Sequence, residues 1–196
     1  GACYANGAGW GNITGITKMA KNIFDVGSSG DNGTLTGFSS RGPARDGRIL
    51  PHIVAPGPGG TSHASPNLGG IFGQLNQAYR FHNGGVTPHS GLLKAVLLNT
   101  ADDMLNPGPD FKTGFGHVNA RRAYEVVRQG QFQTATISQG GSNNHTITVP
   151  ANVKEVKVLV YWPDWEATAG ITTRAIVNDI DIVLQDPNAL DYQPWV

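Results

Sequence analysis

The chain has 196 residues, enough for one large domain or two smaller ones. Its 14 basic and 14 acidic residues balance, which argues against a surface for nucleic acids and against binding to a charged membrane surface. A single cysteine, Cys3, excludes a disulfide within the chain and a multi-cysteine metal site, and no apolar run of about 18 residues predicts a membrane span.

Glycine and proline are abundant, with 27 and 12 residues, which indicates many tight turns. In the first half of the chain, two short apolar runs are typical of buried strands, one within residues 20–27 and one within residues 49–57. The second run is stopped by Pro56 and Gly57. We therefore expect parallel α/β elements in this half.

Three helices are expected after these strands. The first starts near Ser62 and carries one apolar stripe as far as Tyr79, with Pro66 in its first turn, where a missing N–H costs nothing. Its Gly69 and Gly70 suit a helix against which another element packs closely. The second helix is expected over residues 90–99, with its N-cap at Thr87, and it is apolar nearly all round. The third is expected over residues 120–128, with its N-cap at Asn119.

The pattern changes at about residue 129. Four segments alternate apolar and polar side chains with the period of two that half-buried strands show, namely residues 134–138, 145–149, 155–162 and 176–184. A Gly- and Asn-rich loop at 140–144 joins the first two as a hairpin. We therefore predict two parts, an α/β part over residues 1–128 and an antiparallel β-sandwich over residues 129–196.

Ser62 lies where a loop becomes a helix, within the run Gly-Thr-Ser-His-Ala-Ser-Pro of residues 60–66. The first N–H groups of a helix lack partners and the helix dipole is positive there, so an anion that forms beside Ser62 is stabilised. A serine nucleophile needs this environment while an oxyanion develops. A serine at this position also serves as an N-cap, and for the residue taken alone that role is the commoner one.

Several blocks, in the same order along the chain, resemble the subtilisin-like serine proteases, the subtilases of the peptidase S8 family. Besides residues 60–66, they are Phe38–Pro43, Val54–Gly57, Asn99–Asp103 and Gly114–Ala120. Val177–Ile182 and Pro194–Trp195 are similar to the β-sandwich appended to some secreted bacterial subtilases. The resemblance implies the C-terminal part of a subtilisin-like parallel-sheet domain, followed by a jelly-roll-like sandwich.

By this resemblance Ser62 is the catalytic nucleophile of a serine endopeptidase, and Ser65, one turn further on, is structural. The resemblance also implies a secreted or cell-envelope location and a peptide or protein substrate. No cofactor is required for the chemistry, and neither nucleic acid nor membrane is an expected partner.

The base and its orienting carboxylate are missing from this chain. A serine protease needs both, and in subtilases they precede every block seen here. His63 adjoins Ser62, and neighbouring helical residues do not face each other, so His63 is not the base. His52 stands where family members often carry Asp, which we interpret as surface variation. We expect the chain alone to be inactive, a fragment whose N-terminal part, in the same or a separate chain, supplies Asp and His.

Two features near the expected active site stay open at this stage. Asn6 is a candidate for the oxyanion-hole asparagine, although Ala5 precedes it where the family has Gly, and the alternative is an asparagine before Gly1. Only two residues separate Gly57 from Gly60, so either this loop is shortened or residues are missing from the join, and we favour the second.

Asp179 and Asp181 alternate with apolar residues on a predicted strand and could ligate a structural calcium ion, or accept hydrogen bonds from loop N–H groups.

The competing hypothesis for the whole chain is a non-catalytic subtilase-like scaffold or binding module. Retention of the Gly-Thr-Ser turn argues against that hypothesis, because a scaffold has no need to keep it.

Overall fold

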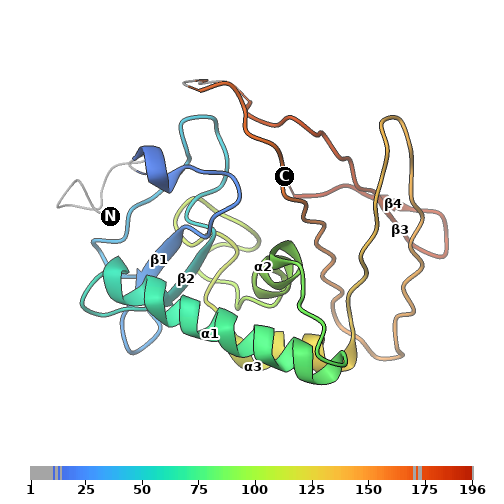
Figure 1. Ribbon diagram of the computed structural model, residues 1–196, viewed down its shortest axis with the longest axis horizontal. Coiled ribbons are helices and arrows are strands. Elements are labelled where there is room, and N and C mark those ends of the chain that lie inside the picture. The colour runs from blue at the N-terminus through green and yellow to red at the C-terminus, as the bar shows by residue number, and fades with distance from the viewer. Residues whose placement is uncertain (1–10, 12, 14, 170, 172–173, 196) are drawn as a thin grey trace.

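The computed structural model describes residues 11, 13, 15–169, 171 and 174–195. The elements in chain order are η1 (Ile16–Lys18), β1 (Val26–Ser29), β2 (Ile53–Pro56), α1 (Thr61–His82), α2 (Ser90–Asn99), α3 (Ala120–Gln129), β3 (Leu184–Gln185) and β4 (Asp191–Tyr192). All three α-helices lie in the first 129 residues, and α1 is the longest element (Figure 1). Among the described residues, no helix combines the length and the apolar character needed to cross a membrane.

Strands β1 and β2 pair in parallel, with Val26 opposite Ile53 and Ser29 opposite Pro56. Residues 116–118 extend this sheet on the other side of β2, because the Val54 N–H donates to the carbonyl of Gly116 and the Val118 N–H donates to that of Val54, both at 2.8 Å. β2 is therefore the middle strand of a small parallel sheet, as the α/β prediction required. The first strand is later than residues 20–27 predict, since β1 begins only at Val26.

Helix α1 packs against β1 and β2 and also contacts α2 and α3, and it crosses in front of α3 in the view of Figure 1. The core consists of buried aliphatic side chains from β2 and the three helices, among them Ile53, Leu68, Leu75, Leu93 and Leu97. Burial of such side chains contributes about 1.5–3 kcal/mol each to folding. The helical spacing read from the sequence is thus confirmed, since Ala64, Leu68 and Leu75 are the buried residues of α1.

The ends of the helices test the predicted caps. Asn119 caps α3 as expected, its side-chain oxygen accepting the N–H of Arg122 at 2.9 Å. The cap of α2 was wrongly predicted: it is His89 and not Thr87, because the imidazole Nδ1 accepts the N–H of Gly91 at 3.1 Å. A histidine with a free ring nitrogen can satisfy an orphan N–H just as an Asn or Ser side chain does.

The second half of the chain forms less regular structure than the alternating pattern predicts. Its described residues contain only the two-residue strands β3 and β4, which pair antiparallel. Residues 131–160 run as two long arms joined by a turn and continue into the C-terminal segment (Figure 1). The turn is at the predicted loop, where the Gly141 N–H donates to the carbonyl of Ser138 at 2.9 Å. The β-sandwich is not confirmed and stays a prediction.

Candidate active site

A tight turn connects the middle strand of the sheet to α1. The Gly57 N–H donates to the carbonyl of Ser29 and the Gly60 N–H donates to the carbonyl of Gly57, both at 2.9 Å. These two hydrogen bonds span the short segment between Gly57 and Gly60. Gly60 has a φ of 145°, which a residue with a Cβ rarely adopts, so glycine is needed at this position.

Gly57 is enclosed on all sides. A Cβ placed on it would lie 2.5 Å from the backbone nitrogen of Ala64 and 2.8 Å from the carbonyl oxygen of Gly60. The fully buried Ser28 of β1 donates its hydroxyl to the Gly57 carbonyl at 2.5 Å, and Asn67 of α1 donates its amide to the Pro56 carbonyl at 2.8 Å. Hydrogen bonds from both neighbouring elements therefore fix the turn that leads to Ser62. Residue spacing alone does not reveal Ser28 or Asn67 in this role.

Ser62 is the second residue of α1 and is exposed to solvent. The N–H groups of His63 and Ala64 donate to the carbonyl of Gly60 at 2.9 and 3.2 Å. Within the described part of the chain, the N–H groups of Thr61 and Ser62 have no acceptor. Two free donors and the positive end of a helix dipole thus lie beside the serine hydroxyl, an arrangement that stabilises a developing oxyanion.

No histidine is hydrogen bonded to Ser62 among the residues that the structure describes. The His63 ring packs over Gly59, since a Cβ on Gly59 would lie 2.4 Å from the imidazole Cε1. The other histidines are engaged elsewhere, with partners that are Asp25 and Lys94 for His52, Tyr124 for His82, Gly91 for His89, Ser29 for His117 and Gln133 for His145. The absence of the catalytic base from this chain stays a prediction.

The structure does contain one serine–histidine pair, between Ser29 and His117. The His117 Nδ1 lies 3.2 Å from the carbonyl of Val118 and can only donate to it, which leaves Nε2 to accept the hydroxyl of Ser29 at 3.0 Å. Ser29 is fully buried, so no substrate reaches its hydroxyl. The pair fixes the end of β1 against residues 116–118. Sequence reasoning missed it, because the two residues are 88 positions apart.

His52 is not a surface residue, which corrects the interpretation made from the sequence. Its Nδ1 accepts the N–H of Asp25 at 3.0 Å, and its Nε2 lies 3.4 Å from the ammonium of Lys94. Burial, followed by the positive charges of Lys94 and Arg48, lowers the pKa of His52 to about 3. Lys94 is itself buried in α2, where it donates to the carbonyl of Ile23 at 2.6 Å, and burial lowers its pKa to about 8. This cluster supports the sheet and lies apart from Ser62.

Asp179 and Asp181, the predicted calcium ligands, do not belong to a larger cluster of possible ligands in the described part of the chain. Asp179 accepts the guanidinium of Arg174 at 2.9 Å, and both Asp179 and Asp181 are exposed. In the described ranges, no three His, Cys, Asp or Glu side chains come together in a way that could hold an ion. Calcium binding by this pair stays a prediction. Asn6, the candidate for the oxyanion hole, lies outside the described residues.

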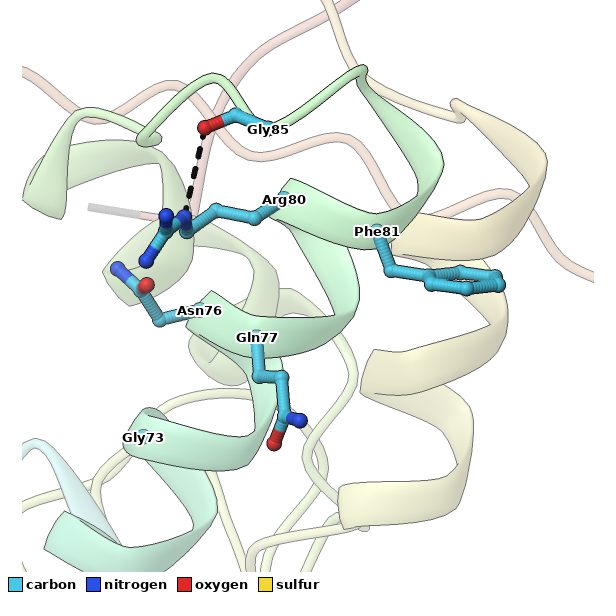
Figure 2. Close-up of a pocket in the computed structure, with 6 residues that line it drawn as sticks. All are labelled: Gly73, Asn76, Gln77, Arg80, Phe81 and Gly85. Atoms are coloured by element: carbon cyan, nitrogen blue, oxygen red, sulfur yellow. Dashed lines mark hydrogen bonds between the residues drawn. The ribbon is translucent and has the colours of Figure 1, made fainter.

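A hollow near the far end of α1 is separate from this site. Six residues line it: Gly73, Asn76, Gln77, Arg80, Phe81 and Gly85 (Figure 2). The Arg80 Nε donates to the carbonyl of Gly85 at 3.4 Å. Arg80 follows Ser62 by 18 residues of helix, which corresponds to about 27 Å at 1.5 Å per residue. The hollow therefore cannot contribute to chemistry at Ser62.

Comparison with known proteins decides the family. The model described as the subtilase family, peptidase S8, matches residues 6–116, more than half of the chain. The chain belongs to the subtilase family. Ser62 and the turn before it lie within the matched residues, so this part is a subtilase-family protease domain.

Three known proteins illustrate what the chain is similar to. The serine protease/ABC transporter B family protein tagA of Dictyostelium discoideum is 24% identical over 198 residues, covering 75% of this subtilase and 11% of the relative. The CspB protease of Clostridium perfringens has a TM-score of 0.52 and 27% identity over 60% of this subtilase and 29% of its own chain. The patellamide maturation protease PatA is 25% identical, with a TM-score of 0.45, over 55% and 44% of the two chains. The subtilase described here spans less than half the length of each.

Proposed function

We propose that this subtilase is a serine endopeptidase and that Ser62 is its nucleophile. The observation that carries the proposal is the exposed Ser62 hydroxyl in the first turn of α1, beside two N–H groups without acceptors. The turn before it is held by Ser28 and Asn67, which gives the hydroxyl a fixed position. A fixed position and pre-oriented donors are two of the properties that acyl transfer requires of a protein, beside the base that takes the hydroxyl proton.

In the proposed reaction the Ser62 Oγ attacks the carbonyl carbon of a peptide bond while its proton passes to a histidine base. The tetrahedral intermediate places its negative oxygen toward the N-terminus of α1. The histidine then gives the proton to the leaving amine, the C–N bond breaks, and an acyl ester on Ser62 remains. Water, activated by the same base, hydrolyses the ester and restores the serine.

The base and its carboxylate come from an N-terminal part of the protease, in the same or a separate polypeptide. This part of the proposal is supported by the histidine contacts above, since each histidine of the described residues other than His63 has a partner away from Ser62. A serine hydroxyl without a base is a poor nucleophile near neutral pH, so this chain alone should be inactive. Secretion or a cell-envelope location is proposed with the activity, on the strength of the family.

A fluorophosphonate probe tests the assignment in the assembled protease. We expect labelling and peptide hydrolysis in the wild type, and loss of both by at least about a thousandfold in Ser62→Ala. Ser65→Ala is the matched control, because Ser65 is also exposed in the first turns of α1, and it should retain labelling. Labelling that persists in Ser62→Ala but disappears in Ser65→Ala would assign the nucleophile to Ser65 instead.

The competing proposal is a non-catalytic scaffold with the subtilase fold. One observation favours it: no histidine or carboxylate hydrogen bonds to Ser62 among the described residues. The same probe separates the two proposals. If the assembled wild-type protein fails to react while a known serine protease reacts under the same conditions, the scaffold is the correct function.

A further inference from the structure

The C-terminal half of the chain is tied to the protease fold by a shielded ion pair. The Lys21 ammonium donates to Asp164 Oδ2 at 2.7 Å and to the carbonyl of Ala175 at 2.7 Å. The side chains of Lys21 and Asp164 are only 14% and 9% exposed. A pair so far from water differs from an exposed surface pair, whose contribution to stability is close to zero.

Asp164 also accepts hydrogen bonds from its own half of the chain. Its Oδ2 accepts the N–H of Val177 at 2.8 Å, and its Oδ1 accepts both the N–H and the side-chain amide of Asn178, at 2.8 and 3.0 Å. Burial by itself raises the pKa of this carboxyl, but the donors outweigh burial and hold its pKa well below the usual range. The Asp164 carboxylate therefore joins Lys21 to Val177 and Asn178.

The backbone of Asp164 makes a second connection to the protease fold. The Asn22 side chain donates to the carbonyl of Asp164 at 2.9 Å and accepts the Asp164 N–H at 3.2 Å. Asn22 thus pairs with Asp164 in both directions. Lys21 and Asn22 lie just before β1, the strand whose Ser28 holds the turn at Gly57.

Two residues before Asp164, Lys157 and Tyr161, contact α2. Asn99 at the end of α2 donates to the carbonyl of Lys157 at 3.2 Å, and the Tyr161 ring lies 4.9 Å from the buried Lys94 ammonium. Trp162 donates its indole N–H to the carbonyl of Asn178 at 3.0 Å. The described residues in 157–178 form no helix or strand, so they depend on these side-chain anchors for their position.

We propose that residues 157–169 and 174–178 form a strap that Asp164 locks onto the protease fold through Lys21 and Asn22. The lock makes this part of the C-terminal half one structural body with the chain that enters β1. The inference concerns conformation and does not depend on the proposed catalytic activity. Other charged side chains around the lock are Arg45, Asp46, Arg48 and Glu166, which line a hollow of about 890 Å³ between the strap and the fold.

Hydrogen exchange of the assembled protein, with its N-terminal part present, tests the lock. Asp164→Asn keeps the shape of the side chain but removes the charge, and Lys21→Met removes the donor. In both variants we expect the amides of Val177 and Asn178 to exchange about tenfold faster or more, while amides in the middle of α1 keep their rates. Lys21→Arg, which keeps the charge, should lie closer to the wild type.

Arg174→Met is the matched control, because it removes an ion pair of the same half, Arg174 with Asp179, whose side chains are 71% and 50% exposed. It should change exchange at Val177 and Asn178 by less than about twofold. Unchanged exchange in both Asp164→Asn and Lys21→Met would overturn the proposal. Uniform acceleration throughout the chain would overturn it too, since it would indicate a role in global stability and not a local lock.

Discussion

Mild acid should destabilise this subtilase through His52. In the folded chain the ring is neutral, because its Nδ1 accepts the Asp25 N–H, and burial together with Lys94 and Arg48 lowers its pKa to about 3. The ring also meets Phe24 edge-on, with centroids 6.3 Å apart, so protonation would place a second charge beside Lys94 in the core.

The direction and the size of this pH dependence follow from the pKa of His52 in the folded and in the unfolded chain. Unfolding exposes the ring and returns its pKa to about 6.5, so the unfolded chain binds the proton first as the pH falls. The stabilisation from the neutral ring is fully present above about pH 6.5 and is lost progressively toward pH 3. Between pH 7 and pH 5 the loss is about 2 kcal/mol, a large fraction of the stability of an ordinary domain.

Urea denaturation of the wild type and of His52→Asn at pH 7, 6 and 5 measures this loss. The Asn side-chain oxygen can accept the Asp25 N–H but does not titrate, so the variant should lack the His52 contribution. Asp25 works in the opposite direction, because burial raises its pKa to about 6 and its contribution to stability grows as the pH falls. Asp25 is present in both proteins, and the difference between them isolates His52.

We expect the wild type to lose about 2 kcal/mol more than His52→Asn between pH 7 and pH 5. Equal losses would refute the reasoning, since they would show that His52 titrates alike in the folded and unfolded chain. A larger loss in the variant would refute it as well.

Two further substitutions test the elements that position the site. Ser28→Ala removes the hydroxyl that donates to the Gly57 carbonyl. We expect fluorophosphonate to label Ser62 about tenfold more slowly in the assembled protease. Thr34→Ala, at an exposed position of the next loop, is the control. Labelling at the wild-type rate would show that the turn holds without Ser28. Asn119→Ala removes the N-cap of α3 and should lower the free energy of unfolding, measured by urea denaturation, by about 1 kcal/mol. An unchanged free energy would mean that the cap does not stabilise α3.

Local sequence signals predicted the helices well. Helix α2 covers the predicted residues 90–99, and Asn119 caps α3, because apolar spacing and caps depend on residues within a few positions of each other. The glycine-rich turn and the helix start at Ser62 were predicted for the same reason. The family blocks added the role of Ser62, which local chemistry alone left as a cap.

Long-range contacts could not be predicted in this way. The Ser29–His117 and Lys21–Asp164 pairs join residues 88 and 143 positions apart, and nothing near either residue in the sequence indicates its partner. His52 was misinterpreted because its departure from the family's Asp was taken as surface variation, whereas in the fold it contacts Asp25 and Lys94. Alternation in residues 134–184 indicates which side chains share a face but does not supply the neighbouring strands that a sandwich needs.

The glycines of α1 bear on which substitutions this helix can accept. A Cβ added to Gly69, Gly70 or Gly73 would meet no described atom within 4 Å, although the sequence suggested close packing there. Each glycine costs about 1 kcal/mol of helix stability relative to alanine. Within the described residues, this face of α1 therefore has room for larger side chains, and alanine at these positions should be tolerated. The inner face, with Ala64, Leu68 and Leu75 buried, has no such freedom.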